Sequence, residues 1–458
     1  MSNPLNQFFQ ELHNGNDTVL SIDIAANGQL IANLQNHLQN TQDDMMSSLV
    51  EKAKLHNGSW TRYNILVVSF LKFCRDVDPW SLWESFDLVF DYYQSLSNCL
   101  LNDSYPLESL VPLFKLTTDI VIPLAARLDE NHEALGTRKH QFLAHVSSII
   151  SKVFNSVKPK FEEISSRFED LPEKQKVLLY VSNRLNNIYM RIDSSSSCAN
   201  IFKNVKPKST IQRFSQFPIR EQIEYRYLLG RYYLLNHRVS NAFHQLNRCF
   251  EMLASQQTVT PALRRNMHRV LNYLIPAGIL FGKVPSMQMV AQVSPELARS
   301  YTPLIHIVCE GNLAAFHCWL AEHETSLRAR RLLLLLLEKM PMLLYRNLVR
   351  RVVLLVAFPQ NLNKISYQAV ENAIRISLGP PDRLARLPII YRTIHAPENV
   401  GNVLETLVTL TFLKANCFPL SGQCVFRKTA NIRDIFPNIN EKLVILFPLN
   451  NEDSWLDE

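Results

Sequence analysis

The sequence of 458 residues contains few glycines and few charged residues. Only 11 residues are Gly, far below the roughly 7% that is usual in soluble proteins. Nucleotide-binding α/β folds need glycine-rich phosphate turns, so this scarcity argues against them and favours helices. Charged residues make up 19% of the chain, below the roughly 25% of typical domains. We therefore expect a partner to cover part of the surface.

No hydrophobic segment is long enough to cross a membrane. The longest uninterrupted apolar run, residues 352–358, is far shorter than the roughly 20 residues that a spanning helix needs. The first residues lack the basic and apolar stretches of a signal peptide. The 8 cysteines include no C-x-x-C pair, which favours reduced thiols in the cytosol or nucleus.

Recognisable catalytic motifs are missing as well. Residues 278–283 resemble a phosphate-binding loop that is one residue short, and Val284 stands where a Ser or Thr would bind magnesium. The nearest approach to a metal-ligand cluster is His306, Cys309, His317 and Cys318. Adjacent helical residues point about 100° apart, so these side chains are not expected to converge on zinc. We predict a chain that is not an enzyme and holds no cofactor or metal.

Helical periodicity dominates the first 325 residues. Apolar residues recur at steps of three and four, for example at Phe142, Val146, Ile149 and Val153. Gly230 and Ala242 are spaced as the small residues of a tetratricopeptide-like helix pair, where they let two backbones approach. Helix pairs cannot bury their faces alone. We therefore predict an all-α superhelix of stacked pairs over residues 1–325.

The pattern changes after residue 326. Leucine-rich helices are expected to break at Pro341 and Pro359, and Ser366 is placed to cap a helix over residues 367–378. A helix over residues 398–414 then precedes two short apolar runs around the turn Ser421-Gly422, which predict a β-hairpin. This order predicts a winged helix over residues 326–450, followed by an acidic tail over residues 451–458.

Charge is distributed unevenly along the chain. The net charge is +7, but residues 1–110 contain 5 Lys or Arg against 13 Asp or Glu. Residues 326–436 contain 16 basic and 6 acidic residues. A basic C-terminal region indicates a polyanion or an acidic partner, although solvated helix faces would explain the same charges.

Basic residues of the predicted winged helix are the first candidate site. They are Lys364, Arg375, Arg383, Arg386, Arg392, Lys414, Arg427, Lys428 and Arg433. The helix over residues 398–414 is nearly neutral, whereas a sequence-specific reader of the major groove usually has Arg or Lys there. The pattern favours binding to the nucleic-acid backbone with little base discrimination. The alternative is that these charges solvate a scaffold module.

A second basic group lies on helices on either side of the predicted domain junction. It consists of Arg226, Arg231, Arg346, Arg350 and Arg351. We expect these residues to dock an acidic peptide or subunit. The alternative is that the long side chains cover apolar surface in a helical groove.

Short segments along most of the chain resemble those of one family. They are residues 75–80 (RDVDPW), 140–143 (HQFL), 185–189 (LNNIY), 222–233 (QIEYRYLLGRYY), 336–341 (LLEKMP) and 414–419 (KANCFP). In this order they resemble the fungal PCI-domain subunit of the TREX-2 mRNA-export complex, whose animal counterpart is PCI domain-containing protein 2. PCI proteins combine a helical superhelix with a winged helix.

The resemblance implies a non-enzymatic adaptor in the nucleus, associated with the nuclear pore, that couples transcription to export. Its implied partners are a large scaffold subunit, a small acidic subunit of the DSS/Sem family, and RNA or DNA bound without sequence specificity. A pure assembly scaffold, of the type found in the proteasome lid, the signalosome or initiation factor three, is the alternative.

Overall fold

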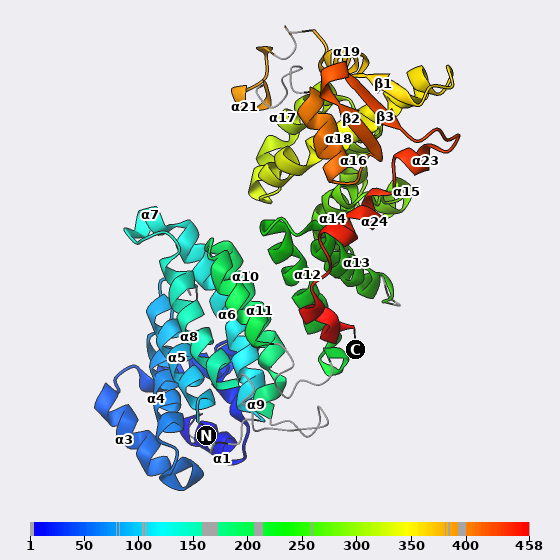
Figure 1. Ribbon diagram of the computed structural model, residues 1–458. Helices are drawn as coiled ribbons and strands as arrows, with labels where there is room; N and C mark the ends of the chain where they lie inside the picture. The colour runs from blue at the N-terminus through cyan, green and yellow to red at the C-terminus, as the bar shows by residue number, and fades with distance from the viewer. Residues whose placement is uncertain are drawn as a thin grey trace. The chain divides into compact units, whose positions relative to one another are not determined.

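The computed structural model describes residues 4–78, 80–81, 83–102, 105, 108–157, 173–205, 214–256, 258, 260–380, 382, 385–392 and 400–457. The chain forms two compact units (Figure 1). Unit 1 comprises residues 1–225 and 452–458, and unit 2 comprises residues 226–451. The boundary that the sequence predicts near residue 325 lies inside unit 2. The division of the chain into a superhelix and a winged helix at that residue stays a prediction.

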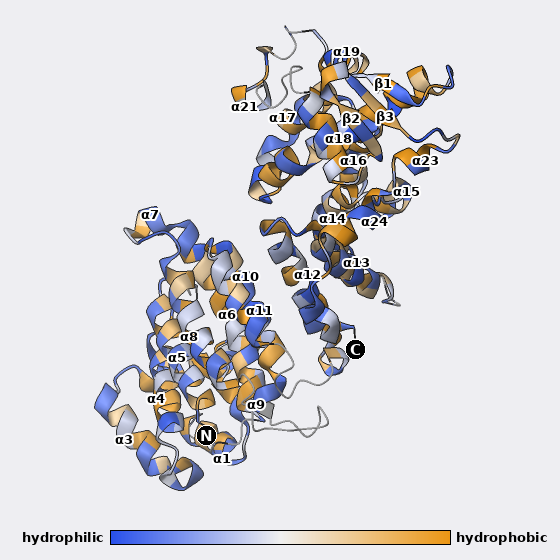
Figure 2. Cartoon of the chain, viewed as in Figure 1, coloured by the Kyte–Doolittle hydropathy of each residue, from blue (hydrophilic) through white to orange (hydrophobic). Residues whose placement is uncertain are grey.

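The described part of unit 1 is built from packed helices. The helices are α1 (Pro4–His13), α2 (Ile24–Leu38), α3 (Asp43–Ala53), α4 (Thr61–Asp76), α5 (Phe86–Leu100), α6 (Leu110–Glu130), α7 (His132–Leu135), α8 (Gln141–Val157), α9 (Glu173–Lys176), α10 (Leu178–Arg191) and α11 (Ser195–Asn204), with the 3-10 turns η1 (Asp17–Leu20), η2 (Leu55–Gly58) and η3 (Phe214–Gln216). Hydrophobic and hydrophilic residues alternate along most of these helices (Figure 2), as expected for helices that bury one face. The boundary of the unit falls inside α12 (Ile219–Leu235).

Unit 2 continues with helices and ends in a small sheet. Its elements are α13 (Val239–Ala254), α14 (Pro261–Phe281), α15 (Met287–Val293), α16 (Pro295–Glu310), α17 (Leu313–Ala329), α18 (Leu333–Val352), the π-helical turn η4 (Val353–Ala357), β1 (Lys364–Ser366), α19 (Tyr367–Leu378), α21 (Ile389–Arg392), α22 (Val400–Thr409), β2 (Ala415–Phe418), η6 (Pro419–Ser421), β3 (Gln423–Phe426), α23 (Ile432–Ile435) and α24 (Ile439–Leu446). No described helix in either unit combines the length and hydropathy that crossing a lipid bilayer requires.

The predicted helix pair is present as α12 and α13. A Cβ atom at Gly230 would lie 2.6 Å from Cγ of Leu246 and 3.5 Å from the carbonyl oxygen of Ala242. Real Cβ contacts do not occur at the first of these distances, so only glycine permits this approach of the two helices. Stacked helix pairs ending in a winged helix confirm the predicted fold class.

The winged helix has the predicted order of elements. Ser366 caps α19 by accepting a hydrogen bond from the backbone N–H of Ala369, and β2 and β3 form the hairpin around Gly422. The sheet has strand order β1-β3-β2, and both outer strands are antiparallel to β3 (Figure 1).

One predicted helix break is wrong. Helix α18 continues through Pro341, although proline removes one hydrogen bond and costs roughly 3 kcal/mol in a helix interior. Pro341, Leu337 and Leu344 are all buried. Burying a leucine side chain contributes about 1.5–3 kcal/mol, so the packed leucines of α18 together outweigh the proline penalty.

The acidic C-terminal segment packs within unit 1. It forms the 3-10 turn η7 (Asn451–Leu456), in which Trp455 is only 4% exposed. The Trp455 ring meets Phe214 at a centroid distance of 5.3 Å and Tyr225 at 6.0 Å. Burial of its two apolar residues, Trp455 and Leu456, therefore makes the predicted tail part of a core.

Candidate nucleic-acid interface

The strand register brings three predicted cations to one edge of the sheet. Lys364 lies opposite Val425 in the β1–β3 pair, and Ala415 lies opposite Phe426 in the β2–β3 pair. Lys414 directly precedes Ala415, and Arg427 directly follows Phe426. The strands β1 and β2 therefore begin at the edge where β3 ends, and Lys364, Lys414 and Arg427 gather there.

Two further cations lie just beyond this edge. Lys428 follows Arg427, and Arg433 lies in the short helix α23. The backbone N–H of Lys414 donates to the carbonyl of Ile435 at 2.8 Å, which holds α23 against the start of β2. We call Lys364, Lys414, Arg427, Lys428 and Arg433 the cationic edge.

The side chains of the cationic edge are exposed. Among the residues that the structure describes, none of the five forms an ion pair. The neighbouring carboxylate, Asp434, instead accepts a hydrogen bond from the hydroxyl of Thr429 at 2.7 Å. Exposed, unpaired cations can meet phosphates at little desolvation cost.

Arg375 and Arg386, two of the other predicted nucleic-acid contacts, lie outside the cationic edge. Arg375 is exposed on α19, where it is paired with Glu371 one turn earlier. Arg386 is exposed in the segment that precedes α21. Arg383 lies outside the described residues, as does the side chain of Arg392. Within the described part, neither Arg375 nor Arg386 forms a hydrogen bond or ion pair with the cationic edge.

Uncharged side chains occupy the tip of the wing. Phe418 and Leu420 are exposed beside the turn at Gly422, and the segment between β2 and β3 contains no Lys or Arg. The predicted cations of the hairpin, Lys414, Arg427 and Lys428, lie at its base and not at its tip.

Helix α22 is shorter than the predicted helix over residues 398–414. It ends at Thr409, and Thr411 adopts a positive φ of 56°. Its single charged residue is Glu405. The hydroxyls of Thr406 and Thr409 donate to the carbonyls of Asn402 and Glu405, so these polar groups are already satisfied by the helix itself.

Two residues of the second basic group are buried. Arg226 is 4% exposed and donates from Nη1 to Oε1 of Gln245 at 2.8 Å. Arg346 is 8% exposed and donates from Nη2 to the carbonyl of Pro437 at 2.8 Å, and burial lowers its pKa to about 10. Their burial removes both arginines from the surface where an acidic partner was expected to dock.

The other three residues of this group are accessible. The Arg231 guanidinium lies over the rings of Tyr227 and Tyr273, at 5.4 Å and 5.0 Å from their centroids. Arg351 is exposed and donates to the carbonyl of Glu310 at 3.0 Å. Arg350 is half-buried on α18.

A larger basic surface escaped the sequence analysis. Residues 226–283 contain eight Lys or Arg and a single acidic residue, Glu251, which is paired with Arg248. We define the α12–α14 basic surface as Arg231, Arg238, Arg264, Arg265 and Arg269. Four of these are exposed and Arg231 is half-buried. A charge count in shorter windows would have revealed this stretch.

Nothing in the described residues suggests catalysis. Within these ranges no three His, Cys, Asp or Glu side chains are arranged to hold a metal ion. His317 is buried, and this burial lowers its pKa to about 4. Gly278 lies inside α14, and Gly282 ends that helix with φ of 76°, so residues 278–283 form a helix terminus.

Comparison with known proteins gives a relative that spans nearly the whole chain. The chain is 44% identical over 454 residues to the nuclear mRNA export protein THP1 of Saccharomyces cerevisiae. The aligned residues cover 98% of this chain and 99% of that protein. It is 25% identical over 259 residues to PCI domain-containing protein 2 of Xenopus laevis, covering 56% and 60% of the two chains. A PCI domain-containing protein of Schizosaccharomyces pombe is 23% identical over 300 residues, covering 63% and 64%. No family model matches the chain.

Proposed function

Because this chain belongs to the PCI-domain family that includes the nuclear mRNA export protein THP1, we propose that its winged helix binds the backbone of RNA or DNA. Members of this family are non-enzymatic scaffold proteins, and the chain is therefore not an enzyme. Nuclear mRNA export is the process in which we place it. The missing catalytic motifs of the sequence agree with this assignment.

The observation that carries the proposal is the cationic edge. The strand register gathers Lys364, Lys414 and Arg427 at one edge of the sheet. Polyanion binding draws its affinity from such exposed cations, through charge attraction and counterion release. The positive charges of this surface are not paired with carboxylates in the described part of the chain and are therefore available to phosphates.

Little base discrimination is expected. Major-groove readers place Arg, Lys, Asn or Gln where they reach base edges, whereas α22 carries Glu405 as its only charge. A carboxylate on the exposed side of this helix would repel phosphates as well. We propose that contacts to the backbone supply the affinity and that sequence contributes little to it.

A gel-shift experiment with a matched control tests this function. The full-length chain is titrated with labelled RNA and DNA oligonucleotides of mixed sequence over a series of salt concentrations. The variant Lys364→Glu, Arg427→Glu, Lys428→Glu should bind at least about tenfold more weakly, with a salt slope lower by about two to three. The control reverses Lys52, Lys139 and Lys152, three exposed cations of unit 1, and changes the net charge equally.

Equal affinity of the two triple variants would reject the cationic edge as the binding surface. Binding that is absent in every protein, including the unaltered chain, would instead favour the alternative function. That alternative is a pure assembly scaffold of the PCI type. Crosslinking to polyadenylated RNA in cells separates the two, since a scaffold without nucleic-acid binding gives no crosslink in residues 326–450.

We also propose a place in a hetero-oligomeric complex. Ile445 is 71% exposed and Phe447 58% exposed at the end of α24, and Val444 and Leu449 beside them are also exposed. Exposed apolar side chains that cluster in this way are typical of protein interfaces. A large scaffold subunit of the export complex is the partner we propose for this segment and for the apolar wing tip.

The α12–α14 basic surface is the docking site that we propose for a small acidic subunit of the DSS/Sem family. Its five arginines lie in a stretch, residues 226–283, that contains a single acidic residue, so an acidic peptide is complementary in charge. Reversing Arg264, Arg265 and Arg269 to Glu should abolish co-purification of that subunit. Unchanged co-purification would reject this surface.

We place the assembled complex in the nucleus, at the nuclear pore.

A further inference from the structure

Two cysteines face each other across the hairpin of the wing. Cys417 in β2 and Cys424 in β3 are directly opposite in the strand register. Both are free thiols, Cys424 buried and Cys417 partly exposed. They form the third of the four residue pairs that join these strands, counted from the cationic edge toward the apolar tip.

The backbone hydrogen bonds of the central strand β3 show whether Cys417 and Cys424 form a hydrogen-bonded or a non-hydrogen-bonded pair. The backbone N–H of Phe426 donates to the carbonyl of Asn363 at 2.9 Å, and the N–H of Tyr367 donates to the carbonyl of Gly422 at 2.8 Å. Hydrogen-bonded pairs alternate along an antiparallel ladder. Since residues 426 and 422 bond toward β1, residue 424 between them does so as well.

Cys424 therefore directs its backbone polar groups toward β1 and away from β2. Its pair with Cys417 is a non-hydrogen-bonded pair, in which the Cα atoms of an antiparallel ladder lie about 4.5 Å apart and the side chains are closest. Disulfides bridge Cα atoms about 4.4–6.8 Å apart. The backbone therefore already has a spacing that a disulfide can bridge.

The thiols themselves are close enough to interact. Burial raises the pKa of the Cys424 thiol to about 12, and the neighbouring Cys417 thiol raises it further in the same direction. Cys424 is consequently a protonated thiol in the folded protein. Cys417 is the partly exposed member, which an oxidant reaches first.

We propose that Cys417 and Cys424 form a reversible disulfide when a hydroperoxide oxidises the protein. The Cys417 sulfur attacks the hydroperoxide, so that an S–O bond forms, the O–O bond breaks, and water or an alcohol leaves. The Cys424 sulfur then attacks the Cys417 sulfur, forming the S–S bond. The S–O bond breaks, and the Cys424 proton leaves with the hydroxyl as water.

The two steps together remove two electrons and two protons from the thiols and reduce one hydroperoxide. The product is a covalent link between β2 and β3 that holds their register. A low-molecular-weight thiol such as glutathione reverses the modification by thiol–disulfide exchange. The wing of this protein is thus a site of cysteine oxidation within the winged helix.

Peptide mapping of the full-length protein tests the proposal. Trypsin cleaves after Lys414 and after Arg427 and releases residues 415–427, which contain both cysteines and no other cleavage site. After hydrogen peroxide and then iodoacetamide, this peptide should be two hydrogen masses lighter than the dithiol and carry no alkyl group. Glutathione added before iodoacetamide should restore two alkylated cysteines.

Two variants control the experiment. Cys309→Ser removes an exposed cysteine outside the sheet and should leave the mapped peptide unchanged. Cys417→Ser should leave Cys424 alkylated after peroxide and denaturation, and circular dichroism checks that this variant folds. Peptide 415–427 with two alkyl groups, at a peroxide dose that oxidises Cys309, would overturn the proposal. A disulfide between two different chains would overturn it equally.

Discussion

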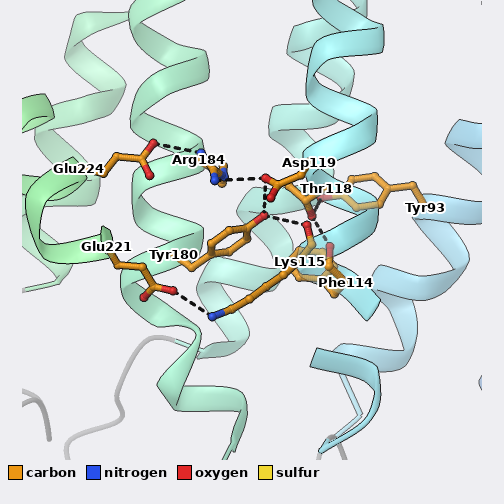
Figure 3. A network of polar contacts seen from close by, with 9 residues as sticks. All are labelled: Tyr93, Phe114, Lys115, Thr118, Asp119, Tyr180, Arg184, Glu221 and Glu224. Carbon is orange, nitrogen blue, oxygen red and sulfur yellow. Dashed lines mark hydrogen bonds and ion pairs between the residues drawn. The ribbon is translucent and has the colours of Figure 1, made fainter. Parts of the chain in front are cut away.

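Charged side chains of unit 1 and of the winged helix differ in whether they form ion pairs. In unit 1, Arg184 lies between two carboxylates, with Nη2 3.1 Å from Asp119 and Nη1 3.0 Å from Glu224 (Figure 3). Lys115 is paired with Glu221 at 2.9 Å. The cationic edge of the winged helix has no such partners among the described residues.

The difference separates structural charges from charges available to a ligand. The network of Figure 3 joins α6, α10 and α12, and Tyr180 extends it by donating to Asp119 at 3.0 Å. A partly buried charge that has lost its partner is destabilising, so these residues serve folding. An exposed cation without a partner contributes little to stability, which leaves the cationic edge free for binding.

The largest effect is expected from breaking the network at its centre. Arg184→Met keeps much of the side-chain volume but leaves Asp119 and Glu224 without their cation. Removing one partner of a fully buried pair costs roughly 3–5 kcal/mol. This network is only partly buried, so the opening free energy of α10, measured by hydrogen exchange, should fall by about 2–3 kcal/mol. The control Arg248→Met, at an exposed pair in unit 2, should change stability by less than about 0.5 kcal/mol. Equal losses in both variants would contradict the comparison.

A smaller effect is expected at the start of α8. The buried carboxylate of Asp129 accepts hydrogen bonds from the N–H groups of Phe142 at 3.0 Å and Leu143 at 2.9 Å. It therefore caps a helix that begins eleven residues after the end of α6. Asp129→Ala should lower the opening free energy of α8 by about 1–2 kcal/mol. An unchanged exchange rate of the first α8 amides would argue against this cap.

A weaker effect is expected on the pH dependence of the unfolding free energy of unit 1. Burial raises the pKa of Glu221 and of Glu224 above the ordinary value of 4.5. The folded state therefore binds more protons than the unfolded state just above pH 4.5, and the unfolding free energy falls as pH rises through that range. The double variant Glu221→Gln, Glu224→Gln should remove this component of the slope. Denaturation at several pH values measures it, and an unaltered slope would contradict the assignment.

The smallest effect on stability is expected from the cationic edge. Lys414→Gln and Arg427→Gln remove charges that form no ion pair in the described part, so unfolding should change by less than about 0.5 kcal/mol. The same changes should weaken nucleic-acid binding and reduce its salt slope by about one for each lost phosphate contact. A large loss of stability would show that these cations have structural partners.

Local rules predicted much of the fold. The cap at Ser366 and the small residue at Gly230 follow from the geometry of one helix end and of one helix pair, and the structure confirms both. The break at Pro341 was wrong, because burial of the flanking leucines is a tertiary effect. Likewise, the acidic composition of residues 451–458 gave no sign that Trp455 would enter a core with Phe214.

From sequence alone came the helical class, the order of winged-helix elements, the absence of catalytic motifs and the excess of cations in residues 326–436. Tertiary structure alone decided which cations a ligand can reach. It buried Arg346 beneath a carbonyl 91 residues further along the chain, gathered Lys364 and Lys414 through strand register, and set Cys417 opposite Cys424. Helix periods and turns depend on neighbours in sequence, whereas burial and register depend on residues that only the folded chain brings together.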